Sequence, residues 1–285
     1  MLKWIALAVI LAVMVGGLLI LRQNRQRPQA NSSYVALGSS FAAGLGLGDR
    51  IPGSPLISQR SVGGYPQQLA RLLKIASFTD MSSSGATVSH VLHGGQLGLG
   101  PQIDALGPET RLVTLTGGGN DIAYVGDLTA MAFGNRGGVK GWLMGLFWKG
   151  AKPASERDFA GLERNLAALL DEIRRRSPQA RIVVATYPAI LPEAGTCDKL
   201  GISAAQADLM RPVAARLAEV TRAVAAAAGA VVVDTAALSA GHDACSAEPW
   251  VNGIAPETGA PFHPTMAGAE ATARAIAKVL QSAGG

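Results

Sequence analysis

The chain has 285 residues, a formal net charge of +5 and only 16% charged residues. Alanine, glycine, valine and leucine dominate, which excludes an intrinsically disordered chain. Four basic residues near the amino terminus carry most of the charge (Lys3, Arg22, Arg25 and Arg27), and the net charge of +1 after residue 30 is too small for a nucleic-acid-binding surface.

The first predicted element is an apolar segment, WIALAVILAVMVGGLLIL, which runs from Trp4 to Leu21 without a charge. Its length is at the lower limit for a helix that spans a bilayer. The residues that follow contain no small-residue cleavage pattern and no cysteine for lipidation. We therefore expect an uncleaved membrane anchor over 1–22, a linker over 23–32 and one domain over 33–283. A cleaved signal peptide, followed by secretion, is the alternative.

The side of the membrane on which this domain lies is left open by the residues alone. Three arginines follow the apolar segment and one lysine precedes it, which favours a cytoplasmic domain by the positive-inside rule. The two cysteines of the chain, Cys197 and Cys245, could instead pair in an oxidising compartment. Two unrelated buried thiols are the other interpretation.

The rest of the chain alternates strand-like and helix-like segments. In chain order we expect a strand at 33–37, a helix at 65–74, strands at 75–82 and from Arg111, a helix at 156–176, a strand from Arg181, a helix at 203–228 through Pro212, a strand at 230–234, and a helix at 266–282 with Thr265 as its N-cap. Strands rich in valine and isoleucine, each separated by a helix, are typical of a parallel sheet covered on both faces. The pattern predicts a three-layer α/β/α sandwich with a five-stranded parallel sheet.

Polar residues follow four of the five strands, where ligands of such sheets bind. Ser39 and Ser40 follow the first strand, Gly85 the second, Asn120 and Asp121 the third, and His242, Asp243 and His263 the fifth. A serine at such a turn needs a base to act as a nucleophile, and His263 is the natural candidate. The Gly85 N–H and the Asn120 amide could bind an oxyanion. His90 and His93 lack partners at metal-ligand spacing, so no metal site is expected.

The ordered set of motifs resembles the SGNH (GDSL-type) serine hydrolases, and especially their secreted actinobacterial esterase and lipase branch. ALGSSFAAG, SSGATV, TGGGND and PFHPT resemble the conserved blocks of that family. The resemblance implies a flavodoxin-like fold with Ser40, not Ser39, as the nucleophile and His263 as the base. It also implies an oxyanion hole formed by Ser40, Gly85 and Asn120.

The resemblance further implies an esterase or lipase that cleaves carboxylic esters through an acyl-enzyme, without a metal or cofactor. Its substrate would be a lipid or an acylated small molecule. We separately expect the protein to be a monomer. Members of this branch commonly carry a disulfide, which favours a Cys197–Cys245 bond and therefore an extracytoplasmic domain held by the apolar segment. A catalytically silent envelope-binding domain, or an acyltransferase or deacetylase acting on envelope glycans or lipids, is the alternative.

One departure from the family pattern concerns the triad acid, which usually lies three residues before the histidine. That position is Ala260 here. We expect either a Ser–His dyad, with the Ala260 carbonyl orienting the ring, or an acid from elsewhere (Asp243, Glu248 or Glu257). In a dyad, His263 would titrate near its usual pKa of about 6.5.

Residues 129–152 fit no element of the sheet and are rich in tryptophan, leucine and glycine. This insertion could wall an acyl pocket, dip into a bilayer or pack as a satellite helix. The sequence does not name the natural ester, because substrate choice depends on pocket shape.

Overall fold

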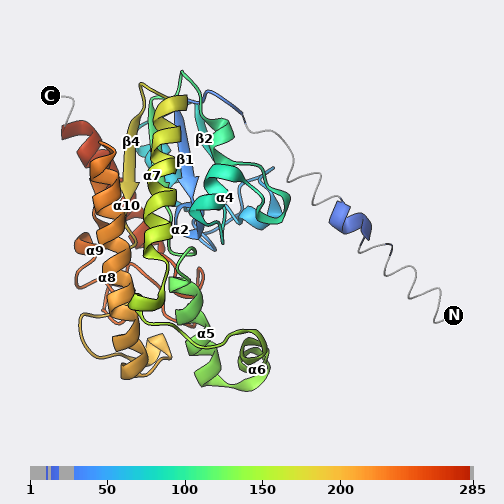
Figure 1. The fold of residues 1–285 in the computed structure, drawn as a ribbon, viewed down its shortest axis with the longest axis vertical. Coiled ribbons are helices and arrows are strands. Elements are labelled where there is room, and N and C mark those ends of the chain that lie inside the picture. The colour runs from blue at the N-terminus through green and yellow to red at the C-terminus, as the bar shows by residue number, and fades with distance from the viewer. Residues whose placement is uncertain (1–10, 12–13, 19–28, 283–285) are drawn as a thin grey trace.

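A five-stranded parallel sheet lies between two layers of helices in the computed structural model, which describes residues 11, 14–18 and 29–282. The strands are β1 (Tyr34–Gly38), β2 (Phe78–Asp80), β3 (Leu112–Thr116), β4 (Arg181–Ala185) and β5 (Val231–Val233). Their order in the sheet is β2-β1-β3-β4-β5, and every neighbouring pair is parallel (Figure 1). The predicted architecture is confirmed.

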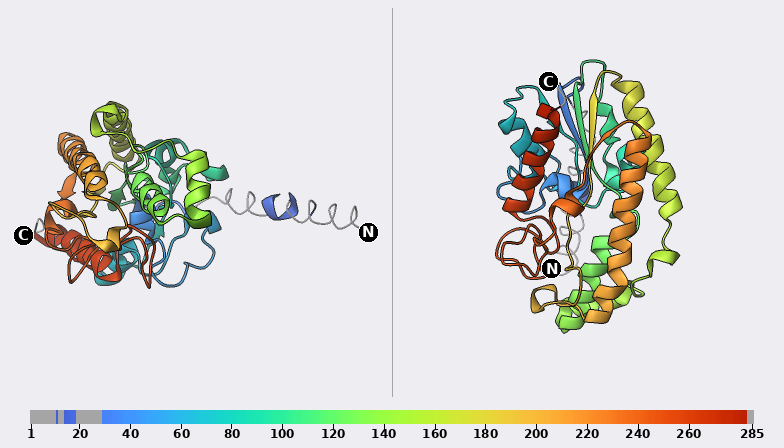
Figure 2. Two further views of the ribbon diagram at one scale, coloured as in Figure 1. Left: turned by 90° about the horizontal axis from the view of Figure 1, so that it is seen from below. Right: turned by 90° about the vertical axis from the view of Figure 1, so that its left-hand side faces the viewer.

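Helices cover both faces of the sheet, as the edge-on view in Figure 2 shows. They are α2 (Ser40–Ala43), α3 (Tyr65–Leu72), α4 (Val88–His93), α5 (Tyr124–Arg136), α6 (Gly138–Phe147), α7 (Phe159–Arg176), α8 (Ala204–Ala227), α9 (Thr235–Leu238) and α10 (Met266–Ser282). Helices α4, α7 and α8 pack on one face, and α3 and α10 pack on the other. All three layers therefore contribute to the core.

Alternate side chains of the central strands point to opposite faces of the sheet, so each strand contributes to both halves of the core. In β1, Val35 and Leu37 join the cluster beneath α7 and α8, whereas Tyr34 and Ala36 join the cluster beneath α3 and α10. All five residues of β1 are buried. Because both faces are covered, apolar residues occupy successive positions, and this explains the unbroken apolar runs in the sequence.

Local hydrogen bonds explain where two of the long helices begin. The Ser203 hydroxyl accepts from the Gln206 N–H at 3.2 Å to cap α8, which then runs through Pro212. The Thr265 hydroxyl accepts from the Gly268 N–H at 3.1 Å, which confirms the predicted cap of α10. The insertion at 129–152 falls in the neighbouring helices α5 and α6 and in the segment after them.

The predicted membrane anchor falls mostly on residues that the structure does not describe. Within the described part of the chain, no helix has both the length and the apolar character needed to cross a bilayer. The anchor over 1–22 therefore stays a prediction.

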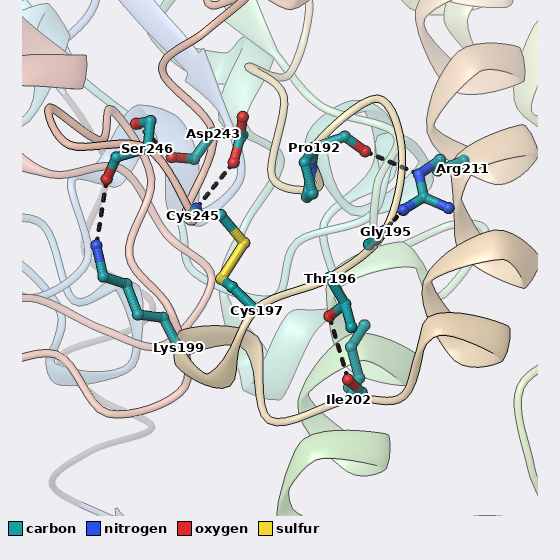
Figure 3. Close-up of a disulfide and its surroundings, with 10 residues drawn as sticks. All are labelled: Pro192, Gly195, Thr196, Cys197, Lys199, Ile202, Arg211, Asp243, Cys245 and Ser246. Atoms are coloured by element: carbon teal, nitrogen blue, oxygen red, sulfur yellow. Dashed lines mark hydrogen bonds between the residues drawn. A yellow bond between two sulfur atoms is a disulfide. The ribbon is translucent and has the colours of Figure 1, made fainter.

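A disulfide between Cys197 and Cys245 joins the loop after β4 to the loop between α9 and α10 (Figure 3). The Lys199 ammonium group donates to the Ser246 carbonyl at 3.2 Å across the same two loops. The second loop continues to His263, so these contacts fix the segment that carries the predicted base. The expected pairing is confirmed.

Removing this bond should destabilise the domain. Cys197 and Cys245 are 48 residues apart, and a loop of that length corresponds to about 4 kcal/mol of unfolding free energy in the chain-entropy model. We expect urea denaturation of the double variant Cys197→Ser, Cys245→Ser to show a loss of that order, and reduction of the wild type to reproduce it. Free thiols in freshly isolated, unreduced protein would contradict the bond.

Candidate active site

The turn that presents Ser40 requires a glycine and is held by a buried amide. Gly38 ends β1 with φ +130°, and a Cβ there would lie 2.2 Å from the Thr116 carbonyl oxygen. The Gln102 side chain accepts from the Gly38 N–H at 2.8 Å and donates to the Gly38 carbonyl at 2.9 Å. Ser40 then becomes the first residue of the short helix α2. The backbone before Ser40 is therefore tightly constrained.

His263 contacts Ser40 directly, although the two residues are 223 positions apart. Its Nε2 lies 2.7 Å from the Ser40 Oγ, and its Nδ1 lies 2.7 Å from the Pro261 carbonyl oxygen. A carbonyl oxygen only accepts, so Nδ1 carries the proton in the neutral ring. Nε2 is then free to accept from the Ser40 hydroxyl, which is the arrangement that a general base needs.

A main-chain carbonyl, not a carboxylate, orients the imidazole. The predicted carbonyl of Ala260 is wrong: it accepts from the His263 N–H at 3.2 Å and from the Asn252 amide at 3.3 Å. The Pro261 carbonyl contacts the His263 Nδ1 instead. Phe262, which lies between Pro261 and His263, is in the left-handed region at φ +57°. This conformation turns the chain within two residues. The strained position therefore lies beside the predicted base.

The candidate acids lie elsewhere in the loop that ends at His263. Asp243 accepts from the Cys245 N–H at 2.8 Å and so supports the disulfide (Figure 3). No described hydrogen bond or ion pair joins His263 to Asp243, Glu248 or Glu257. The geometry within the described residues is thus that of a Ser–His pair.

Three donors are available around Ser40. Among the described residues, the backbone N–H groups of Ser40 and Gly85 have no acceptor, and Gly85 has φ +80°. The Asn120 amide donates one of its two hydrogens to the Ala86 carbonyl at 2.8 Å. The Ser83 N–H donates to the Gly38 carbonyl at 3.0 Å, so hydrogen bonds draw all three segments together. Such preset donors can stabilise a tetrahedral oxyanion.

The surroundings of the His263 ring are mainly apolar. Its centroid lies 5.1 Å from that of Phe41, and Phe41 contacts Tyr187 at 4.4 Å. Burial lowers the pKa of the His263 imidazole below its usual value, and the hydrogen bond to Pro261 raises it by less. The expectation of an unshifted pKa is therefore wrong, because the sequence did not reveal how deeply the ring is buried.

A model of the GDSL-like lipase/acylhydrolase family matches residues 36–271. The chain belongs to this family. Lipase 2 of Streptomyces coelicolor is 34% identical over 267 residues, which cover 87% of this chain and 85% of that lipase. A lipase of Streptomyces rimosus is 30% identical over 243 residues, covering 83% of this chain and 82% of that lipase.

Solved structures agree with this GDSL-like assignment. The extracellular lipase of Streptomyces rimosus superposes with a TM-score of 0.68 at 25% identity, covering 87% of this chain and 99% of that structure. Phospholipase A1 of Streptomyces albidoflavus gives a TM-score of 0.67 at 28% identity, covering 88% and 98%. The chain is a carboxylic ester hydrolase.

The sequence pattern did not predict that Ser39 and Tyr187 act together to support the GDSL-like site. The Ser39 hydroxyl lies 2.8 Å from the Tyr187 hydroxyl, which also accepts from the Gly119 N–H at 3.2 Å. This chain of contacts ties the turn of Ser40 to the glycine turn before Asn120. The available signal was the position of Tyr187, two residues after the end of β4 and at the same edge of the sheet.

Other candidate side chains have structural roles. His242 contacts the Glu248 carbonyl at 2.8 Å through Nδ1 and stacks on Trp250, whereas Asp121 accepts from the Val88 N–H at 3.0 Å. His90 belongs to the capping box of α4 with Thr87. Within the described part of the chain, no three His, Cys, Asp or Glu side chains are grouped as metal ligands would be.

Single removal of the candidate acids should have little effect on catalysis. We expect alanine at Asp243, Glu248 or Glu257 to lower kcat/KM by less than about tenfold, roughly 1.4 kcal/mol. Asp243→Asn is the matched control for the hydrogen bond to Cys245. A loss of about a thousandfold in any folded variant would identify a displaced triad acid and contradict the dyad.

The pH profile should reflect the burial of His263. The base must be neutral to accept the Ser40 proton, so activity falls as the pH drops through its pKa. Because that pKa is lowered, we expect the acid limb of kcat/KM to have its midpoint below about 6.5. Ala260→Asp should move the midpoint upward if its carboxylate reaches the ring, because a negative charge favours the imidazolium. A wild-type midpoint above 6.5 would contradict the role of burial.

Proposed function

We propose that this ester hydrolase uses Ser40 as its nucleophile and His263 as its general base and acid. The 2.7 Å contact between Ser40 Oγ and His263 Nε2 carries the proposal. Ser40 Oγ attacks the ester carbonyl while Nε2 takes the hydroxyl proton. The Pro261 carbonyl accepts a hydrogen bond from the His263 Nδ1–H and so stabilises the imidazolium that forms.

The negative charge of the tetrahedral intermediate is bound by the N–H groups of Ser40 and Gly85 and by the Asn120 amide. His263 then returns its proton to the departing alcohol, which leaves an acyl group on Ser40. A water molecule then gives a proton to His263 and attacks the acyl-enzyme in the same way. This step releases the carboxylic acid and restores the Ser40 hydroxyl. Among the described residues, neither the Ser40 N–H nor the Gly85 N–H has an acceptor, and this supports such a binding role.

The substrate class that we propose is an acyl ester of a lipid or small molecule. It is supported by relatives named lipases and by a structural neighbour named phospholipase A1. Purified protein should be tested on p-nitrophenyl esters of increasing acyl length and on a phospholipid. Turnover with a preferred chain length is expected, whereas no turnover of any ester would favour a binding domain. Faster product formation with an added alcohol would favour an acyltransferase.

We also propose that the domain works as a monomer outside the cytoplasm, either held by an anchor over 1–22 or released after cleavage. The Cys197–Cys245 bond and the similarity to the extracellular lipase of Streptomyces rimosus support this location. Sequencing the amino terminus of the mature protein separates the two forms, because only the anchored form keeps residues 1–22.

A further inference from the structure

Helix α6 exposes an apolar face that no described element covers. Val139, Trp142 and Leu146 are 74%, 65% and 56% exposed. They are spaced three and four residues apart, so they lie on one side of the helix. A helix packed on a domain usually turns such a stripe toward the core. Here the stripe faces outward.

The base of this helix is fixed to the domain. Trp148, just after α6, donates from Nε1 to the Asp127 carboxylate at 2.8 Å. Asp127 is paired with Arg157 at 2.7 Å, and both of these side chains are almost fully buried. A Cβ at Gly141 would lie 2.7 Å from the Phe133 carbonyl oxygen, so the backbone of α6 approaches α5 closely. The outward stripe thus belongs to an anchored helix pair.

Uncompensated positive charge lies at both ends of α6. Arg136 ends α5 two residues before α6 begins, and Lys149 and Lys152 follow α6. All three are exposed and form no ion pair with any described residue. The sequence contains no acidic residue from 128 to 155. Two copies of this surface would repel each other, whereas an anionic surface would attract it.

The helix pair lies at the catalytic end of the molecule. Helix α5 begins four residues after Asn120, and α5 and α6 project beyond the carboxyl ends of the strands in Figures 1 and 2. Ser40 and Asn120 follow the carboxyl ends of β1 and β3. A surface that contacted α6 would therefore meet the end of the molecule that holds the candidate active site.

We propose that α6 docks on an anionic lipid surface, with Val139, Trp142 and Leu146 in the interfacial region and the three cations beside the headgroups. Tryptophan favours the boundary between headgroups and acyl chains, and each nearby lysine or arginine strengthens binding to anionic lipid. Docking goes beyond the hydrolysis of esters, because it states how the domain is oriented on its substrate surface.

A fluorescent label on α6 tests docking without any assay of activity. Gly145 is exposed and a Cβ there meets nothing within 4 Å, so a label on Gly145→Cys in the full chain causes no clash. The control label sits on Ala167→Cys, an exposed position of α7. In vesicles of phosphatidylcholine and phosphatidylglycerol, a nitroxide-bearing lipid should quench the label at 145 and leave the label at 167 bright. Both labelled proteins carry the same apolar segment at 4–21, so attachment through that segment is common to them, and the difference between positions 145 and 167 reports the contact of α6 with lipid.

Changes to the surface should weaken this quenching in two separate ways. The triple change Val139→Ser, Trp142→Gln, Leu146→Gln should abolish it, with no loss of Tm because the side chains are exposed. Each of Arg136→Gln, Lys149→Gln and Lys152→Gln should lower the docking equilibrium by roughly fivefold. Equal quenching at 145 and 167, or no effect of the triple change, would overturn the proposal. Concentration-dependent shielding of the label without lipid would identify a second copy as the occupant and would also overturn it.

A second measurement separates docking from the proposed chemistry. The triple variant should lose hydrolysis of an ester embedded in anionic vesicles and keep hydrolysis of soluble p-nitrophenyl acetate. Leu72→Gln removes another exposed leucine, from α3, and should change neither activity. If the protein cleaves no ester at all, the proposed function fails while the quenching result still decides docking. Equal loss on both substrates would overturn the docking role.

Discussion

Replacing Ser40 by alanine should abolish ester turnover. The change removes the only atom that we propose to form the acyl-enzyme, so kcat should fall by at least about 10⁴-fold. Labelling by a fluorophosphonate should disappear as well, because the probe reacts with the same Oγ. Turnover of p-nitrophenyl esters and mass-spectrometric mapping of the label give the two measurements.

Ser39→Ala is the matched control, because it removes a hydroxyl one residue away. Ser39 contacts Tyr187 and does not contact His263. Loss of its hydrogen bonds to the Tyr187 hydroxyl and, at 3.5 Å, to the Thr116 carbonyl should cost about 1–2 kcal/mol of unfolding free energy and leave most of the turnover and labelling. A label that maps to Ser39, or unchanged turnover in Ser40→Ala, would show that the nucleophile has been misassigned.

Replacing Asn120 by alanine should lower kcat by about 10²- to 10³-fold, which is typical for one side-chain donor to an oxyanion. The charge that this amide binds develops after the substrate has bound, so KM should change little. Steady-state kinetics on a soluble ester separates the two constants. Gly85 and Ser40 would still supply their backbone donors, which explains a residual rate.

Asn135→Ala provides the control for lost hydrogen bonding. The exposed Asn135 amide donates to the Gly201 carbonyl at 3.0 Å and to the Gln206 side-chain oxygen at 2.7 Å, whereas the half-buried Asn120 amide donates to the Ala86 carbonyl at 2.8 Å. Both variants should therefore lose some stability through lost hydrogen bonds, and only Asn120→Ala should lose kcat. A rise in KM with unchanged kcat would contradict an oxyanion role for Asn120.

The fold could be predicted from the sequence because the spacing of apolar residues indicates which segments form strands and which form helices. Unbroken apolar runs report strands buried on both faces, and helical periodicity reports helices that cover them. The positions of polar residues after strands then pointed to Ser39 or Ser40, Asn120 and His263, since the carboxyl ends of parallel strands share one edge. The resemblance to the SGNH hydrolases selected Ser40 over Ser39. The contact between Ser40 and His263 agrees with that inference.

Contacts between loops were decided only by the tertiary structure. The acceptor for His263 is the Pro261 carbonyl rather than that of Ala260, because Phe262 adopts a left-handed conformation that no sequence pattern announced. The direction of the His263 pKa shift depends on burial by segments distant in sequence. Asp243 was also a candidate acid from its position in the sequence. In the structure its carboxylate accepts a hydrogen bond from the Cys245 N–H, beside the disulfide. Periodicity records which residues are buried, but the partner of a buried polar group depends on the three-dimensional path of the chain.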